Sequence, residues 1–117
     1  MANKYQGVAY VRVNGTEYAS GDDATLTPGG ATRSTVKGSR VYGYQETPEE
    51  ATVEATFYNN EETDVMGLKD ITDATIEFET DVGQTYLLAN AWVVDTVSLT
   101  GKGEIKIKFA AVQCKRV

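Results

Sequence analysis

The amino-acid sequence predicts a mainly β fold, with two packed antiparallel sheets that form a sandwich or partial barrel and one short helix on the flank. The 117 residues include 32 β-branched side chains (15 Thr, 13 Val and 4 Ile) against 5 Leu, and this balance suits a pleated surface better than a helix. Several stretches alternate apolar and polar residues, and the 11 Gly supply turns between them. The length fits one domain spanning residues 1–117.

The first strand pair is predicted at a hairpin centred on Asn14-Gly15. Val8–Val13 and Thr16–Tyr18 flank this dipeptide and are rich in β-prone residues. Asn-Gly between such runs is a strong hairpin signal, because type I′ turns need a positive φ at both central residues. A short strand is expected at Ala24–Thr27, ended by Pro28-Gly29-Gly30.

Four further strands are expected. Three of them show period-two alternation, in which one apolar set of side chains faces the core. The fourth, Thr85–Leu99, is richer in apolar residues, and its first part is expected to be covered on both faces. Trp92 lies in an apolar run and is expected in the core. A single helix is predicted over Glu61–Lys69 with Asn60 as its N-cap, because acidic residues fill the first turn and Lys69 lies near the end. The four strands are Ala51–Tyr58, Ala74–Glu79, Thr85–Leu99 and Glu104–Ala111.

The charge balance argues against binding to nucleic acid or to a membrane. The net charge is −6, whereas phosphate and anionic lipid attract clustered Lys and Arg. No apolar run approaches the length of a membrane span, and Met1–Gly7 is too polar for a signal peptide. The single Cys114 cannot form an internal disulfide and is expected to be a small buried hydrophobe. A reducing cytoplasm is the expected place of synthesis.

No catalytic residue, metal site or cofactor is expected. The chain has no His, and one Cys provides no paired thiols for zinc. Ser34-Thr35-Val36-Lys37 matches S-x-x-K, but the elements that accompany that motif in serine enzymes are missing. Glu77 and Glu79 share a strand face about 7 Å apart, a spacing that a glycosidase could use. A solvated acidic face is the simpler interpretation, because nothing apolar nearby would raise one pKa.

A basic stretch is the strongest candidate for a contact surface. Arg33, Lys37 and Arg40 occur with no acid between Asp23 and Glu46. The segment at about 31–48 is less regular than the strands and is expected to form a long loop or hairpin arm, because long ordered connections usually carry function. A solvated loop is the alternative. The arm would be anchored by Val41, Tyr42 and Tyr44, and acids that could receive it on a second copy are Glu46, Glu49, Glu50, Glu54, Glu61, Glu62 and Asp64.

Three segments, taken in order, resemble the Mu-like phage tail tube proteins. They are residues 38–48 (GSRVYGYQETP), residues 73–86 (DATIEFETDVGQTY) and residues 90–92 (NAW). The resemblance implies two packed sheets with a flanking helix and a structural role without chemistry. In that family, subunits form hexameric rings whose strands join one inner β-barrel, and the rings stack into a hollow tube through which DNA is delivered.

The resemblance also implies partners and a location. The arm would contact the adjacent ring, and the other partners would be a tail sheath, a tape measure protein and tail-end proteins. The location would be the virion tail, after assembly in the bacterial host cytoplasm. An acidic lumen would let DNA slide without specific binding. The candidate lumen wall is Thr75, Glu77 and Glu79, with Glu104, Lys106 and Lys108 as a second candidate face.

Two other functions stay open on the residues alone. A tube ring of a secretion system would share the architecture. A monomeric carbohydrate- or peptide-binding β-sandwich would use Trp92 and tyrosines as a stacking platform.

Overall fold

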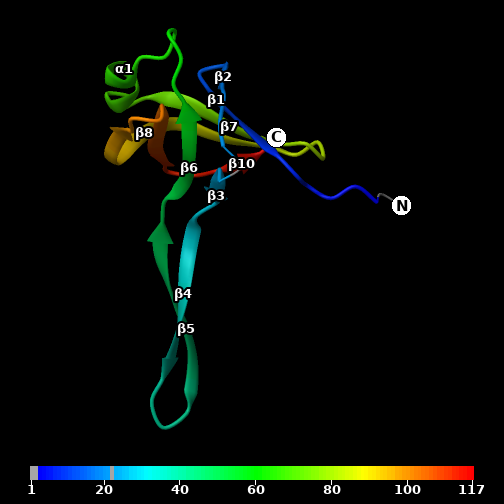
Figure 1. The fold of residues 1–117 in the computed structure, drawn as a ribbon. Helices are drawn as coiled ribbons and strands as arrows, with labels where there is room; N and C mark the ends of the chain where they lie inside the picture. The colour runs from blue at the N-terminus through cyan, green and yellow to red at the C-terminus, as the bar shows by residue number, and fades with distance from the viewer. Residues whose placement is uncertain (1–2, 22) are drawn as a thin grey trace.

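The computed structural model describes residues 3–21 and 23–117. Within these residues, strands form an eight-stranded antiparallel sheet and a separate two-stranded sheet, with one short helix (Figure 1). The prediction of a mainly β fold with a short helix is confirmed. The elements are β1 Ala9–Val13, β2 Thr16–Tyr18, β3 Thr25–Thr27, β4 Gly30–Lys37, β5 Val41–Glu49, β6 Ala51–Tyr58, α1 Val65–Lys69, β7 Ala74–Thr80, β8 Thr85–Leu99, β9 Glu104–Ala111 and β10 Lys115–Arg116.

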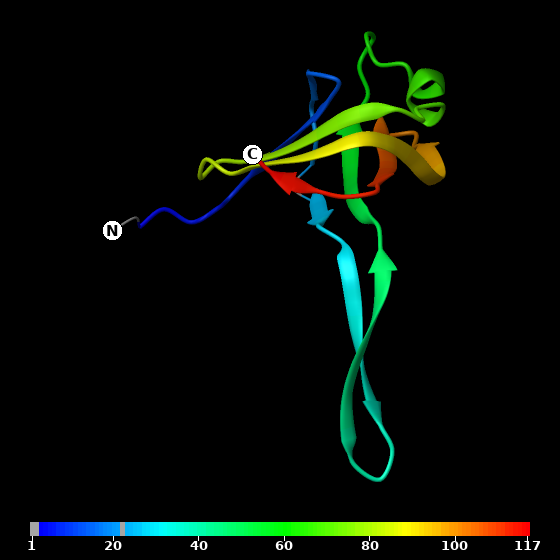
Figure 2. The same ribbon diagram turned by 180° about the vertical axis from the view of Figure 1, so that it is seen from behind.

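The two packed layers are two halves of one continuous sheet. Its order is β2-β1-β7-β8-β9-β6-β3, with β10 beside β8. The 15-residue strand β8 pairs first with β7 and then with β9, and its register shifts in both ladders. Asn90 (φ 54°) and Asp95 (φ 60°) lie at these shifts in the left-handed region. Such bulges bend a strand, and the two halves therefore cross face to face (Figure 2).

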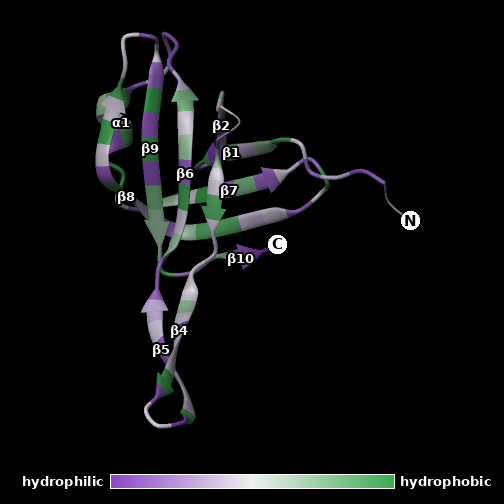
Figure 3. Cartoon of the chain, turned by 60° about the horizontal axis from the view of Figure 1, so that its bottom comes forward, coloured by the Kyte–Doolittle hydropathy of each residue, from purple (hydrophilic) through white to green (hydrophobic). Residues whose placement is uncertain are grey.

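The hydrophobic core lies between the two halves. Val11 and Ile76 from one half and Phe57 and Phe109 from the other are fully buried. The Phe57 ring stacks on Tyr18 at a centroid distance of 4.9 Å and lies 6.4 Å from the Phe109 ring. Figure 3 shows the alternation of hydrophobic and hydrophilic residues along β6 and β9 that makes this packing possible.

The predicted hairpin turn and the apolar strand faces are confirmed, but the opposite strand faces are less exposed than alternation predicts. The turn at Asn14-Gly15 has φ values of 52° and 85°, both positive as the hairpin signal requires. Alternation with Val53, Ala55 and Phe57 predicts an exposed polar face that includes Thr52 and Thr56 of β6, but both are buried, as is Ala110 of β9. The expectation that Trp92 lies in the core is wrong, because its side chain is only half-buried and lines a shallow hollow with Glu50. The outer face of this half-sheet is therefore partly apolar.

The helix is shorter than predicted. The backbone N–H of Glu62 donates to Asn60 Oδ1 (2.9 Å), as does the Thr63 hydroxyl (3.1 Å), and this turn replaces the expected first helical turn. Helix α1 begins at Val65 instead. Asp64 is its N-cap, because its carboxylate accepts a hydrogen bond from the backbone N–H of Met66 (3.1 Å). Among the residues that the structure describes, no helix is long and apolar enough to cross a membrane.

Candidate functional site

Strands β4 and β5 form a two-stranded ribbon, the arm, which projects from the body of the molecule (Figures 1 and 2). The cross-strand pairs run from Gly30 opposite Glu49 to Lys37 opposite Val41. This pairing agrees with the hairpin form of the predicted arm, and the segment is more regular than the sequence indicated. Proline usually interrupts a strand, but Pro48 lies within β5 and is tolerated because both strands of a two-stranded ribbon are edges.

The arm makes little contact with its own body. Every residue of β5 is exposed, and in β4 only Val36 is half-buried. Because of this projection, the radius of gyration is 17.0 Å, whereas a compact chain of this length has about 13 Å. A two-stranded ribbon on its own is marginally stable in water. The geometry thus favours an arm that is covered in an assembly.

The two faces of the arm differ in chemistry. On the aromatic face, the Arg33 guanidinium lies 5.6 Å from the centre of the Tyr44 ring and 3.9 Å from Glu46 Oε2. Near the tip, Arg40 covers Tyr42 at the same distance. The other face carries small or uncharged side chains besides the Glu49 carboxylate, which accepts from the Thr32 hydroxyl (2.8 Å). Its members are Thr32, Ser34, Val36, Gln45, Thr47 and Glu49.

The predicted acidic residues do not form one surface. Glu49 and Glu50 lie at the root of the arm, and Glu54 lies on the outer face of β6, where its carboxylate is 3.5 Å from Lys108 Nζ. Glu61 and Glu62 are exposed in the loop before α1, and the whole length of β6 separates them from the arm root. Of the two other candidates, Glu46 lies within the arm beside Arg33 and Asp64 caps α1, so the seven acids are spread over the arm, its root, the sheet and the loop.

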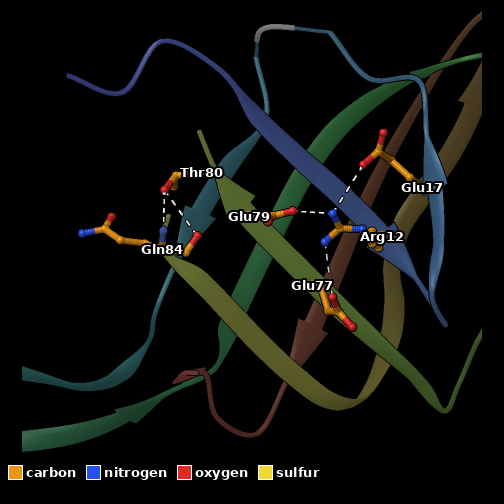
Figure 4. A network of polar contacts seen from close by, with 6 residues as sticks. All are labelled: Arg12, Glu17, Glu77, Glu79, Thr80 and Gln84. Atoms are coloured by element: carbon orange, nitrogen blue, oxygen red, sulfur yellow. Dashed lines mark hydrogen bonds and ion pairs between the residues drawn. The ribbon is translucent and has the colours of Figure 1, made fainter. Parts of the chain in front are cut away.

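The candidate lumen face carries an ion-pair network that the sequence analysis missed. Arg12 of β1 contacts Glu77 (3.4 Å), Glu17 (3.6 Å) and Glu79 (Figure 4). The hydrogen bond to Glu79 and the charges of all three carboxylates raise the pKa of Arg12, against the opposing effect of desolvation. Strand alternation places Arg12 on the outer face of β1, but only the pairing of β1 with β7 shows that it meets these acids.

Loss of this guanidinium is expected to destabilise the fold. In an Arg12→Met variant, Glu17, Glu77 and Glu79 face one another without a cation, so Tm should fall by a few degrees at low salt. The loss should shrink at high salt, because screening weakens carboxylate repulsion. Thermal melts monitored by circular dichroism check this, with the exposed Arg116→Met as a matched control. Equal losses in the two variants, or a loss that salt leaves unchanged, would contradict the network's role.

The rest of the described chain offers no obvious chemistry. Among the described residues, no group of three or more His, Cys, Asp or Glu side chains is arranged to hold a metal ion. Cys114 follows β9 and is half-buried, and this burial raises the pKa of its thiol. Glu77 and Glu79 are both engaged by Arg12 on an outer sheet face.

Comparison with known proteins identifies the kind of molecule that carries this arm. A family model described as phage tail tube protein matches residues 2–116. The chain belongs to that family. It is 59% identical to the Mu-like prophage FluMu tail tube protein of Haemophilus influenzae, over 100% of this chain and 99% of the relative. It is also 44% identical to the tail tube protein of Escherichia phage Mu, over 98% and 97% of the two chains.

Membership in the tail tube family confirms the Mu-like resemblance and decides between the open functions. The protein is a structural, non-enzymatic component of the virion tail, where it assembles with other tail components. A hydrolase that uses the carboxylate pair on β7 and a carbohydrate-binding module that uses Trp92 are both inconsistent with membership in this family. A fold built for assembly also accounts for a long ribbon that its own body leaves uncovered.

Proposed function

We propose that this tail tube protein forms hexameric rings that stack into the hollow tube through which DNA passes, and that the arm makes the contact between rings. The observation that carries the proposal is the exposed arm, with three basic side chains and an aromatic face that its own body does not cover. Val41, Tyr42 and Tyr44 are 62–70% exposed. Large apolar side chains gathered on one extended ribbon are typical of an interaction site.

The proposal assigns the outer face of β1 and β7 to the lumen. Thr75, Glu77 and Glu79 lie there, half-buried and on one strand face. Three carboxylates around one guanidinium leave this cluster two negative charges, since 3 − 1 = 2. A negative wall repels phosphates, so DNA moves past it without specific binding. The second candidate face is less acidic, because Lys108 lies 3.5 Å from Glu54 and 3.9 Å from Asp95.

The proposal also includes partners outside the tube. A contractile sheath would surround the stacked rings, a tape measure protein would fill the lumen before DNA passes, and tail-end proteins would close the tube. Each of these would meet a surface that the ring repeats around its axis.

Negative-stain microscopy of the purified protein tests the proposal, and rings or tubes are the expected result. The K37E/R40E variant should form fewer and shorter tubes with unchanged melting behaviour, because both side chains are exposed and make no ion pair among the described residues. The assembly that persists should depend less on salt than that of the wild type. Tube formation by this variant at wild-type levels would remove the arm from the stacking contact, and a wild-type protein that stays monomeric at high concentration would end the proposal.

A further inference from the structure

The arm and the acidic loop before α1 lie at opposite ends of the molecule. Strand β6 leads directly from the root of the arm to this loop at residues 59–64 (Figures 1 and 2). The longest extent of the chain is 61 Å. A copy placed end to end with another, in the same orientation, would therefore bring an arm tip close to an acidic loop.

A groove runs beside this loop. It consists of two adjoining hollows, both lined by Thr16, Tyr18 and Glu62, between strand β2 and the segment that leads into α1. The lining residues include three acids, Glu17, Glu62 and Asp64, and no Lys or Arg is among them. The Glu17 carboxylate lies 3.6 Å from Arg12 and that of Asp64 caps α1, so Glu62 is the acid of the groove that the arm would meet. Tyr18, held against the core by its stacking on Phe57, provides an aromatic wall beside them. Carboxylates next to an aromatic ring suit guanidinium and tyrosine side chains.

The charges of the arm and of the rest of the chain are complementary. The arm carries Arg33, Lys37 and Arg40, and no acid occurs between Arg33 and Glu46. Besides these cations the arm contains two acids, Glu46 and Glu49, so the remainder of the chain has 8 basic residues against 15 acids, a charge of −7. Opposite patches at the two ends of identical subunits attract each other head to tail and disfavour contacts between like ends.

We infer that the arm of one copy docks through its aromatic face into the groove at the opposite end of a second copy, with Lys37 and Arg40 facing Glu61 and Glu62. This inference rests on the proposed stacking of rings and names the surface that receives the arm. The other acids fit less well, because Glu54 already faces Lys108. Glu49 and Glu50 lie at the root of the arm of their own copy, away from the end of the molecule that an arm tip of a second copy would reach. The contact is heterologous, so each copy still offers a free arm at one end and a free groove at the other, and stacking continues.

A charge swap tests which acids receive the arm. Either K37E/R40E or E61K/E62K alone should raise the protein concentration needed for tube formation by about tenfold or more, because like charges then face each other across the contact. The combined variant K37E/R40E/E61K/E62K should return to wild-type assembly. The matched control K37E/R40E/E49K/E50K, which reverses the acids at the arm root, should stay as weak as K37E/R40E. Sedimentation of tubes over a concentration series provides the measurement, and thermal melts confirm that each variant is folded.

The outcomes separate this inference from the proposed function. A swap that assembles no better than K37E/R40E, or rescue by the arm-root control, overturns the groove assignment and leaves stacking by the arm in place. A wild-type protein that forms no tubes overturns both.

Cross-linking provides a readout that does not depend on charge. In a Cys114→Ser background, Thr35→Cys on the aromatic face and Thr16→Cys in the groove should form disulfide-linked oligomers when tubes are treated with copper phenanthroline. Copper and dissolved oxygen accept the two electrons and two protons that the paired thiols lose. Ser34→Cys with Thr16→Cys places the first thiol on the other face of the ribbon and should give a several-fold lower yield. Equal yields from both pairs, or none from either in intact tubes, would overturn the docking geometry.

Discussion

Replacing Phe57 by alanine should lower the free energy of unfolding by about 3–5 kcal/mol, the range for truncating a buried aromatic side chain. The side chain is fully buried, and its ring meets both Tyr18 and Phe109. It therefore links β2 to the second half of the sheet, and its loss leaves a cavity between the two halves. Because small domains are stable by only about 5–15 kcal/mol, Tm should fall by roughly 10–20 °C. Urea unfolding monitored by circular dichroism measures the change.

The adjacent residue provides the control for this prediction. Tyr58 is 48% exposed on the other face of β6, so Tyr58→Ala should cost no more than about 1 kcal/mol. Neighbouring residues of a strand point to opposite faces, and a slip of one residue in the register of β6 would exchange the two results. Equal losses of stability in the two variants would contradict the orientation of this strand.

Much of the fold is predictable because its signals are local. The Asn14-Gly15 turn and the buried apolar positions of β6, β7 and β9 depend on residues next to each other in the sequence, and the structure confirms them. The helix start was wrong for an equally local reason, since the Asn60 side chain closes a turn instead of capping a helix. The half-buried position of Trp92 depends on what covers β8, and alternation within that strand does not report it.

The candidate site was predictable in its charges but not in its arrangement. The run of cations without acids marks the arm in the sequence. Most residues of β4 are polar, so no apolar alternation indicates that β4 pairs regularly with β5. Arg12 is 5 to 67 residues away in the sequence from the carboxylates that it contacts, and these residues come from three strands. The sequence therefore does not indicate that they meet. The separation of Glu62 from the arm likewise depends on the direction in which β6 leaves the arm root. Alternation within β6 does not indicate that direction.

Replacing Gly29 by alanine should both destabilise the fold and redirect the arm. Gly29 lies just before β4 with φ at 72°, and a Cβ there would lie 2.5 Å from the Glu50 carbonyl oxygen and 2.6 Å from the Ala51 nitrogen. Both are backbone atoms where the chain passes from arm to body, so the clash has no flexible side chain to displace. A left-handed alanine costs about 1–2 kcal/mol, and overpacking adds about 1–3 kcal/mol. We expect a total of about 2–5 kcal/mol by urea unfolding, with loss of tubes in negative stain.

Gly30 separates the effect of the close approach from that of backbone strain. Its φ is also positive, at 102°, but a Cβ added there would have no atom within 4 Å. Gly30→Ala should therefore cost only the strain of about 1–2 kcal/mol and should keep more of the assembly than Gly29→Ala. If stacking depends on where the arm points, tube formation should fall with the displacement of the arm root and not simply with stability. Equal free energies of unfolding and equal tube yields for Gly29→Ala and Gly30→Ala would show that the close approach of Gly29 to Glu50 does not determine the direction of the arm.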